Sequence, residues 1–278
     1  MGTFESAEVV RTKEGRQYHI GAGPRDVAST ILLCGDPARA HRVATYLTDT
    51  AKPITHREYV TITGKYRGHP VTVMATGMGP DNTEIAVVEL AQLAPACTLI
   101  RIGSSGGLMQ GIEIGSLVIS TGAVRLENTS AAYVIDGYPA VAHIEVTLAL
   151  MEAANRLGVK TTTGLTATAP GFYAPQARKV PGFPVRDPEL PERLDAMKVV
   201  NFEMESSVLF TLGHLCGARA GTVCAVVNNR HQNRFISEEE MHTAEQRCIE
   251  VGLGAVEILA AMDARRGRAP IWLPSMGL

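Results

Sequence analysis

The sequence places a charged residue, Arg101, inside an apolar stretch. It is the second-last residue of the run 98–102 (TLIRI), where a charge is costly unless it meets a partner. The next residues, 103–107 (GSSGG), predict a glycine-rich turn that offers backbone N–H groups and the hydroxyls of Ser104 and Ser105. A guanidinium, amides and hydroxyls together can bind phosphate. The alternative for Arg101 is a structural ion pair with a buried carboxylate.

Two glutamates lie close together in residues 203–206 (EMES), which follow the apolar pair Val199-Val200. We expect this segment to open a helix. Residues two apart on a helix point to different faces, so Glu203 and Glu205 are expected to have different roles. Capping of the helix N-terminus is the alternative for one of them, because the helix dipole favours a carboxylate there.

The segment 172–178 (FYAPQAR) could recognise a planar ring. Pro175 predicts a loop, and residues two apart in an extended loop face the same side, which brings Gln176 and Arg178 together. The amide can donate one hydrogen bond and accept one, and the arginine donates to a further oxygen. Uracil presents that row as O2, N3–H and O4, whereas cytosine and adenine present an amine that arginine cannot accept. Phe172 could pack on the ring; the alternative is a solvated surface loop.

These residues need a scaffold, and the chain predicts one by alternating strands with helices. Strands are expected at residues 29–34, 71–75, 98–102, 116–120, 160–168 and 221–227. Helices are expected at residues 37–47, 81–93, 203–216 and 238–262. This alternation indicates an α/β layered domain with a parallel or mixed sheet. Ligands in such folds gather at the carboxyl ends of the strands, which selects the loops at 35–37, 76–80, 103–107 and 228–231.

Composition is that of an ordinary globular chain. Of 278 residues, 45% are hydrophobic and 19% charged, and the formal net charge is -2, so no basic field favours nucleic acid or an anionic membrane. No apolar run is long enough for a membrane-spanning helix, and the polar N-terminus lacks the apolar core of a secretion signal. The five cysteines form no CxxC pair and read as buried free thiols. We therefore expect a cytoplasmic protein.

Eight segments, taken in order, resemble the nucleoside phosphorylase family, and specifically its uridine phosphorylase branch. They are GDPARAHRV (35–43), HREYVTITG (56–64), ATGMG (75–79), ELAQL (89–93), RIGSSGG (101–107), FYAPQAR (172–178), NFEMES (201–206) and NNRHQ (228–232). The resemblance extends from about Tyr18 to about Met262. It implies a single-domain, three-layer α/β/α sandwich with a central mixed sheet, spanning residues 1–263, followed by a C-terminal tail at 264–278.

The resemblance also implies roles for particular residues. Phosphate would be held by Gly35, Arg39, Arg101 and Ser104, with Arg57 reaching from the adjacent subunit. The ribose would be held by Met204 and Glu205, with His19 of the adjacent subunit at the 5'-hydroxyl. The base would be held by Ser105, Phe172, Gln176 and Arg178, with Arg230 behind them. Arg101, Glu205, Gln176 and Arg178 would be the catalytic residues.

The implied reaction is reversible phosphorolysis of uridine, with deoxyuridine and thymidine as further candidates, to uracil and ribose 1-phosphate in pyrimidine salvage. Its partners would be uridine, inorganic phosphate and further copies of the chain, as a homodimer or homohexamer, with neither nucleic acid nor membrane. No cofactor and no catalytic metal are implied, although a monovalent cation could bind near Glu58.

Several positions depart from the family pattern. Ser104 and Ser105 stand where threonine is common, the turn at 78–81 is one residue shorter, and Asn228 stands beside the base where an apolar residue is usual. The tail at 264–278 has no counterpart, and it is either disordered or docks Trp272 on a neighbouring surface.

Three other functions remain open from the sequence. A purine nucleoside phosphorylase is disfavoured because Asn229 stands near the position of an aspartate, and asparagine cannot protonate N7 of a purine. A nucleosidase would leave the phosphate arginines unexplained, and a nucleoside-binding protein without turnover would leave the intact catalytic set unexplained.

Overall fold

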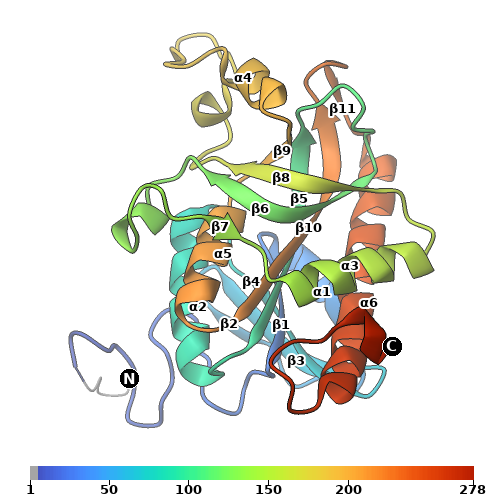
Figure 1. Ribbon diagram of the computed structural model, residues 1–278. Coiled ribbons are helices and arrows are strands. Elements are labelled where there is room, and N and C mark those ends of the chain that lie inside the picture. Colours follow the sequence, from blue (N-terminus) through green and yellow to red (C-terminus); the bar gives the residue numbers. More distant parts are fainter. Residues whose placement is uncertain (1–5) are drawn as a thin grey trace.

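The computed structural model describes residues 6–278 and shows a central sheet with helices on both of its faces (Figure 1). The strands are β1 (Thr30–Cys34), β2 (Ile54–His56), β3 (Tyr59–Tyr66), β4 (His69–Ala75), β5 (Thr98–Gly107), β6 (Leu117–Arg125), β7 (Ala140–Val141), β8 (Thr161–Thr168), β9 (Val199–Glu203), β10 (Arg219–Asn229) and β11 (Arg234–Phe235). The helices are α1 (Pro37–Ala44), α2 (Pro80–Leu93), α3 (Ile144–Arg156), α4 (Leu190–Ala196), α5 (Ser206–Leu215) and α6 (Glu238–Arg266). Short 3₁₀ turns are η1 (Ser130–Ala132), η2 (Ala174–Gln176) and η3 (Pro274–Met276). The sequence predicts that the N-terminus is not a secretion signal. Part of that segment, residues 1–5, lies outside the described residues.

The sheet is mixed and partly closed on itself. Its strands run in the order β11-β10-β6-β8-β9-β5-β1-β4-β3-β2, with β7 beside β6. A further pairing between β10 and β5 joins β5, β9, β8, β6 and β10 into a ring. The pairs β1–β4, β1–β5 and β6–β8 are parallel, whereas β3–β4 and β6–β10 are antiparallel. The expected α/β fold with a central mixed sheet is confirmed.

The helices cover the two faces of the sheet because the central strands are apolar on both. Along β1, Leu32 and Cys34 pack into the cluster that contains α1, α3 and α6. The alternate residues Ile31 and Leu33 pack into the cluster that contains α2 and α5. Side chains of a strand alternate between faces, so a strand buried on both faces is a continuous apolar run.

Strand β5 continues through residues 103–107, so the predicted glycine-rich turn is wrong. β10 pairs with β5 along its whole length, from Arg219 opposite Thr98 to Asn229 opposite Gly107. The glycines allow close packing within the sheet: a Cβ atom on Gly106 would lie 2.7 Å from a side-chain oxygen of Asn228. Glycine permits both a turn and such a close approach, so composition did not distinguish them.

The helix expected at residues 203–216 also begins later than predicted. Residues 199–203 form β9, which pairs with β8 through Glu203 opposite Thr168. Helix α5 begins at Ser206. Glu203 therefore ends a strand, and Glu205 lies in the short link between that strand and the helix.

The C-terminal tail docks on its own chain. Helix α6 runs to Arg266, beyond the expected end, and the following segment returns to α3 and α6. Trp272 is only 9% exposed; its backbone N–H donates to Glu145 at 2.7 Å and its indole N–H donates to the carbonyl of Gly277 at 3.0 Å. Of the two alternatives for the tail, docking of Trp272 is observed, with α3 and α6 as the surface.

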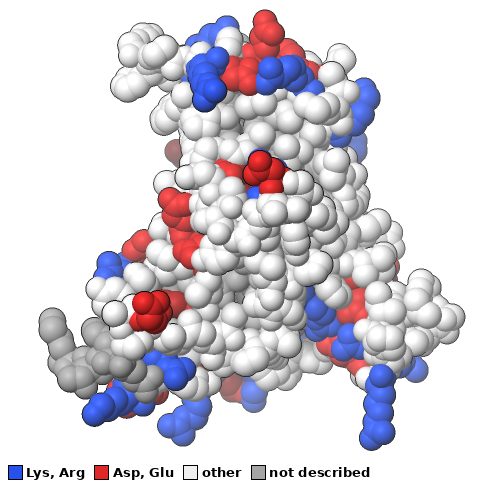
Figure 2. Space-filling model, turned by 60° about the vertical axis from the view of Figure 1, so that its left-hand side comes forward, with Lys and Arg blue, Asp and Glu red and all other residues white. Residues whose placement is uncertain are grey.

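Charged side chains are unevenly distributed over the surface. On the face shown in Figure 2 they gather mainly toward the two ends of the molecule, with acidic and basic groups intermixed, and the broad middle carries few. Among residues 6–278, no helix is long and apolar enough to cross a membrane.

Candidate active site

A cleft of about 520 Å³ opens where β5 lacks a neighbouring strand. On one side of β5, β1 pairs only as far as Leu33 opposite Arg101, and β9 begins to pair at Phe202 opposite Gly106. Within the described chain, residues 102–105 have no strand partner on that side. The carboxyl ends of β1, β4 and β9 meet at this gap, which is where open α/β sheets bind ligands.

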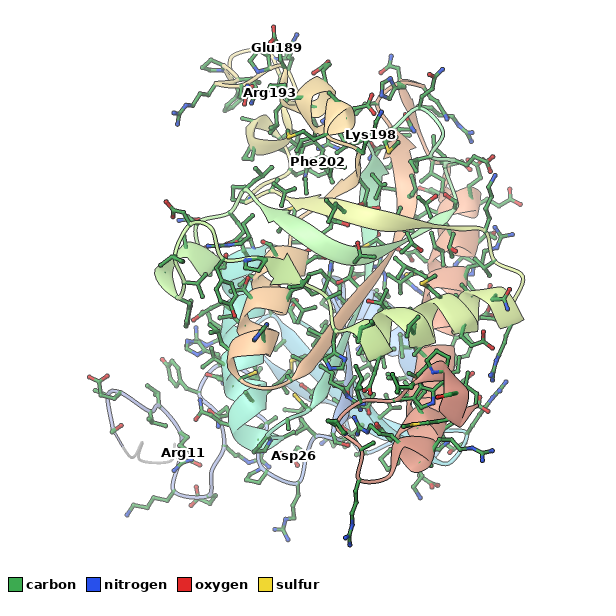
Figure 3. The ribbon with its side chains drawn as sticks, viewed as in Figure 1. Arg11, Asp26, Glu189, Arg193, Lys198 and Phe202 are labelled. Atoms are coloured by element: carbon green, nitrogen blue, oxygen red, sulfur yellow. The ribbon has the colours of Figure 1, made fainter. Side chains whose placement is uncertain are left out.

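Most of the predicted site residues line this cleft. They are Gly35, Arg39, Arg101, Ser104, Ser105, Phe172, Gln176, Arg178, Met204 and Glu205. The remaining lining residues are Asp36, Pro37, Glu58, Gly77, Met78, Gly106, Phe202, Glu203, Val227 and Asn228. Phe202, labelled in Figure 3, lies on β9 beneath α4 and packs with Leu194 of that helix.

Arg101 is held by both glutamates of the EMES segment. Its Nε atom donates to Glu203 at 3.0 Å, and its Nη2 atom lies 2.6 Å from Glu205. Glu203 also accepts from the hydroxyl of Thr168 and from the backbone N–H groups of Glu205 and Ser206, at 2.6–3.0 Å. Arg101 thus has the carboxylate partners of a structural ion pair and also faces the cleft. Glu203 fixes the backbone of the link, whereas Glu205 contributes its carboxylate to the cleft.

The buried charges in this cluster depend on one another. Burial raises the pKa of Glu205, and the positive charge of Arg101 opposes that rise. Burial disfavours the charge on Arg101, but Glu205 and Glu203 outweigh it and raise the pKa of the guanidinium. Glu205 also accepts a hydrogen bond from the backbone N–H of Gly79 at 2.7 Å. Arg101 therefore remains a cation facing the cleft.

Arg39 reaches the cleft from α1 and is oriented by three oxygens. Its guanidinium donates to the hydroxyl of Ser104 at 2.8 Å, to the carbonyl of Ile102 at 3.2 Å and to Glu245 at 2.5 Å. Arg42, one turn further along α1, donates to the other oxygen of Glu245, also at 2.5 Å. Burial lowers the pKa of Arg39, but Glu245 more than compensates. Glu245 lies on α6, 206 positions from Arg39, and no sequence pattern indicated this contact.

Gln176 and Arg178 meet as predicted, but through a different local structure. A guanidinium nitrogen of Arg178 donates to the side-chain oxygen of Gln176 at 2.7 Å and also to the carbonyl of Phe172. The segment is not extended: Ala174–Gln176 is a 3₁₀ turn, and Ala177 has a left-handed backbone with φ 57°. This bend, rather than strand-like alternation, brings the two side chains together.

The ring of Phe172 and the charge of Arg230 complete this corner. The guanidinium of Arg178 lies 3.6 Å from the centre of the Phe172 ring. Arg230 donates to the backbone carbonyl of Gln176 at 2.5 Å from outside the cleft lining. Burial and the neighbouring Arg230 lower the pKa of Arg178 to about 10, so the guanidinium stays charged at neutral pH. The corner offers guanidinium donors and an amide NH2 group to a planar ligand.

Arg57 and His19 do not line the cleft of their own chain. Arg57 lies over the ring of Tyr18 at 4.9 Å. The Nδ1 atom of His19 lies 2.7 Å from Glu89, which also accepts from the backbone N–H groups of His19 and Ile20. Their contribution to a site on another copy of the chain stays a prediction.

Comparison with known proteins identifies the family. The family model of the Phosphorylase superfamily matches residues 29–259. The chain is 48% identical over 280 residues to a uridine phosphorylase of Thermococcus kodakarensis, and this alignment covers 98% of each of the two chains. It is 36% identical over 247 residues to a uridine phosphorylase of Escherichia coli, covering 87% of this chain and 97% of that protein.

A solved structure agrees with these sequence matches. A nucleoside phosphorylase of Trypanosoma brucei, described as showing uridine phosphorylase activity, superimposes with a TM-score of 0.85 at 26% identity. It covers 90% of this chain and 99% of its own. The chain belongs to the phosphorylase superfamily and, within it, to the uridine phosphorylase branch.

Proposed function

We propose that this protein catalyses the reversible phosphorolysis of uridine to uracil and ribose 1-phosphate. The observation that carries the proposal is that one cleft is lined by the hydrogen-bonded residues Arg39 and Ser104, by the Gln176–Arg178 pair and by Glu205. An anion site, a carboxylate for hydroxyl groups and a donor pair for a planar base together suit a nucleoside and phosphate.

The phosphate acts as the nucleophile. One of its oxygens forms a bond to C1' of the ribose while the bond from C1' to N1 of uracil breaks, and the bonding electron pair leaves with the base. Arg39 and Arg101 hold the phosphate, and Ser104 adds a hydroxyl. Glu205 binds the ribose hydroxyls, so catalysis relies on positioning and not on a covalent enzyme intermediate.

The base leaves as an anion, and the cleft stabilises it. Positive charge builds on the ribose ring in the transition state, and negative charge spreads over N1, O2 and O4 of uracil. The guanidinium of Arg178 and the amide of Gln176 donate toward these oxygens, and Phe172 and Ser105 contact the ring. A proton from solvent then neutralises the released uracil. The same donors disfavour cytosine, whose amine finds no acceptor on arginine.

The proposed active form is an oligomer with shared sites, a homodimer or homohexamer in the cytoplasm that serves pyrimidine salvage. Arg57 and His19 would complete the phosphate and ribose sites of the adjacent copy. Mixing Arg57→Ala protein with Arg178→Ala protein, each of which should have reduced activity on uridine, tests this arrangement, because mixed assemblies contain some sites with both native residues. Recovered activity supports shared sites, and no recovery after verified subunit exchange rejects them.

The central test is the loss of uridine absorbance with and without inorganic phosphate, with inosine as a parallel substrate. Cleavage of uridine only when phosphate is present supports the proposal. Cleavage without phosphate indicates a nucleosidase, comparable turnover of inosine contradicts the base assignment, and binding of uridine without any turnover indicates a nucleoside-binding protein.

A further inference from the structure

Two adjacent asparagines at the end of β10 use their side chains differently. The amide of Asn229 donates to the carbonyls of Met109 and Ile112 at 3.0 and 2.8 Å, and its oxygen accepts from the N–H of His231 at 2.9 Å. Asn229 is therefore a satisfied structural residue. The side chain of Asn228 has no hydrogen-bond partner among the described residues, although Asn228 is only 7% exposed.

An irregularity in the sheet turns Asn228 toward the cleft. The pairing of β10 with β5 shifts between Val226 and Asn228, so that Val226 lies opposite Ser105 and Asn228 opposite Gly106, with one extra residue between them. Such a bulge redirects side chains. As a result, the consecutive residues Val227 and Asn228 both line the cleft.

The amide of Asn228 is available to a ligand in that cleft. It lies against the backbone of Gly106, where an added Cβ atom would be 2.7 Å from Oδ1 and 3.2 Å from Nδ2. The glycine thus makes room for the amide on the cleft side of β5. An amide that has no partner in the protein and borders a cleft bonds water or a ligand there, which favours a role in binding over a role in packing.

The edge of the base that meets Asn228 follows by elimination from the proposed function, on which this inference rests. N1 of uracil faces the ribose at Glu205, and the row O2, N3–H and O4 faces Gln176 and Arg178. The edge that remains carries C5 and C6. An apolar group on C5 would cover the amide of Asn228 and separate it from water without giving it a hydrogen bond.

We propose that Asn228 is a specificity-determining residue that makes this site favour pyrimidine nucleosides with hydrogen at C5 over those with a 5-methyl group. The amide keeps its water or bonds O4 when C5 carries hydrogen, and it loses both when C5 carries methyl. A valine of similar size would remove this penalty and give the methyl group an apolar contact.

The test compares Asn228→Val with wild-type protein on uridine, 5-methyluridine and 2'-deoxyuridine at saturating phosphate. The ratio of kcat/KM for 5-methyluridine to that for uridine should rise about tenfold, the lower range for one methyl group in an apolar pocket. The ratio for 2'-deoxyuridine to uridine is the internal control and should stay unchanged, because the sugar does not face Asn228. An unchanged 5-methyl ratio overturns the inference.

Binding supplies a second readout that does not need turnover. The ratio of the Kd for thymine to the Kd for uracil should be lower in Asn228→Ala protein than in wild-type protein. A ratio that is the same in both proteins also overturns the inference. Wild-type protein that fails to cleave uridine with phosphate overturns the proposed function itself. If the wild-type enzyme cleaves uridine with phosphate and the 5-methyl ratio of the variant is unchanged, only the role of Asn228 is overturned.

Discussion

Replacing Arg178 by alanine should remove the preference for uracil nucleosides over cytosine nucleosides. The change deletes the guanidinium that lies 3.6 Å from the Phe172 ring and 2.7 Å from the side-chain oxygen of Gln176. It also frees that oxygen of Gln176. The amide can then turn either its donor or its acceptor toward the base, so it no longer distinguishes a carbonyl from an amine.

The magnitude follows from the hydrogen bond that is lost. A hydrogen bond to a charged group contributes about 1.5–3 kcal/mol, or roughly 10- to 150-fold in kcat/KM at about 1.4 kcal/mol per factor of ten. Because Arg178 is only half-buried, we expect the lower part of this range for uridine, about 10- to 30-fold. Cytidine turnover should change little, since its amine makes no bond to Arg178. The uridine-to-cytidine ratio should therefore fall about tenfold or more.

The assay is chromatographic release of uracil and cytosine at saturating phosphate. Lys179→Ala is the matched control, because it removes a positive charge from the exposed next residue of the same loop. Both variants should show the wild-type KM for phosphate. An Arg178→Ala enzyme with the wild-type uridine-to-cytidine ratio would refute the base contact, and one with an altered KM for phosphate would indicate that Arg178 contacts the phosphate.

Three further predictions concern other parts of the molecule. Arg101→Ala should abolish saturation by phosphate, because a hydrogen bond from a charged group to phosphate contributes about 1.5–3 kcal/mol. The Kd for uracil should change less than about threefold, since the loss of a phosphate contact alone corresponds to a larger factor than this. Unaltered phosphate saturation would show that the anion binds elsewhere. Burial raises the pKa of Glu205, so the folded wild-type protein loses stability as the pH rises through that pKa. Glu205→Gln has no such carboxyl group. The difference obtained by subtracting the wild-type Tm from the Tm of Glu205→Gln should therefore be larger at about pH 8 than at about pH 5. A difference with the opposite pH trend would contradict this sign. Trp272→Ala should cost about 3 kcal/mol and lower the Tm by roughly 6–12 °C while kcat/KM for uridine stays unchanged, because Trp272 packs on α3 and α6 away from the cleft; an unchanged Tm would mean that the tail does not stabilise the fold.

Much of the fold was predictable because the apolar runs are local signals. The strands that contain Ile31, Val73 and Leu99 appear at the expected positions, since each is a continuous apolar run buried on both faces. Their ends were less predictable. Residues 199–203 and 103–107 became strands because partner strands pair with them, and that pairing is set by residues far away in the sequence.

The site was predictable to the extent that its residues are contiguous. Gln176 and Arg178 are two positions apart and meet, although a 3₁₀ turn and not an extended loop brings them together. The contact between Arg39 and Glu245 joins α1 to α6, and nothing local to either residue specifies it. Long-range ion pairs of this kind depend on helix packing, so they follow from the fold and not from a motif.

The correction at residues 103–107 changes how the anion must be held. A glycine-rich turn would bind phosphate with free backbone N–H groups, whereas in β5 the pairing with β10 uses the groups on one side. On the cleft side, the carbonyl of Ile102 accepts from Arg39 and so draws a cation, not an anion, to the gap. We therefore expect anion binding to depend mainly on side chains, namely the two arginines and the hydroxyl of Ser104. Ser104→Ala should accordingly raise the KM for phosphate, an effect that backbone binding by a turn would not produce, and an unchanged KM would restore the backbone as the main phosphate ligand.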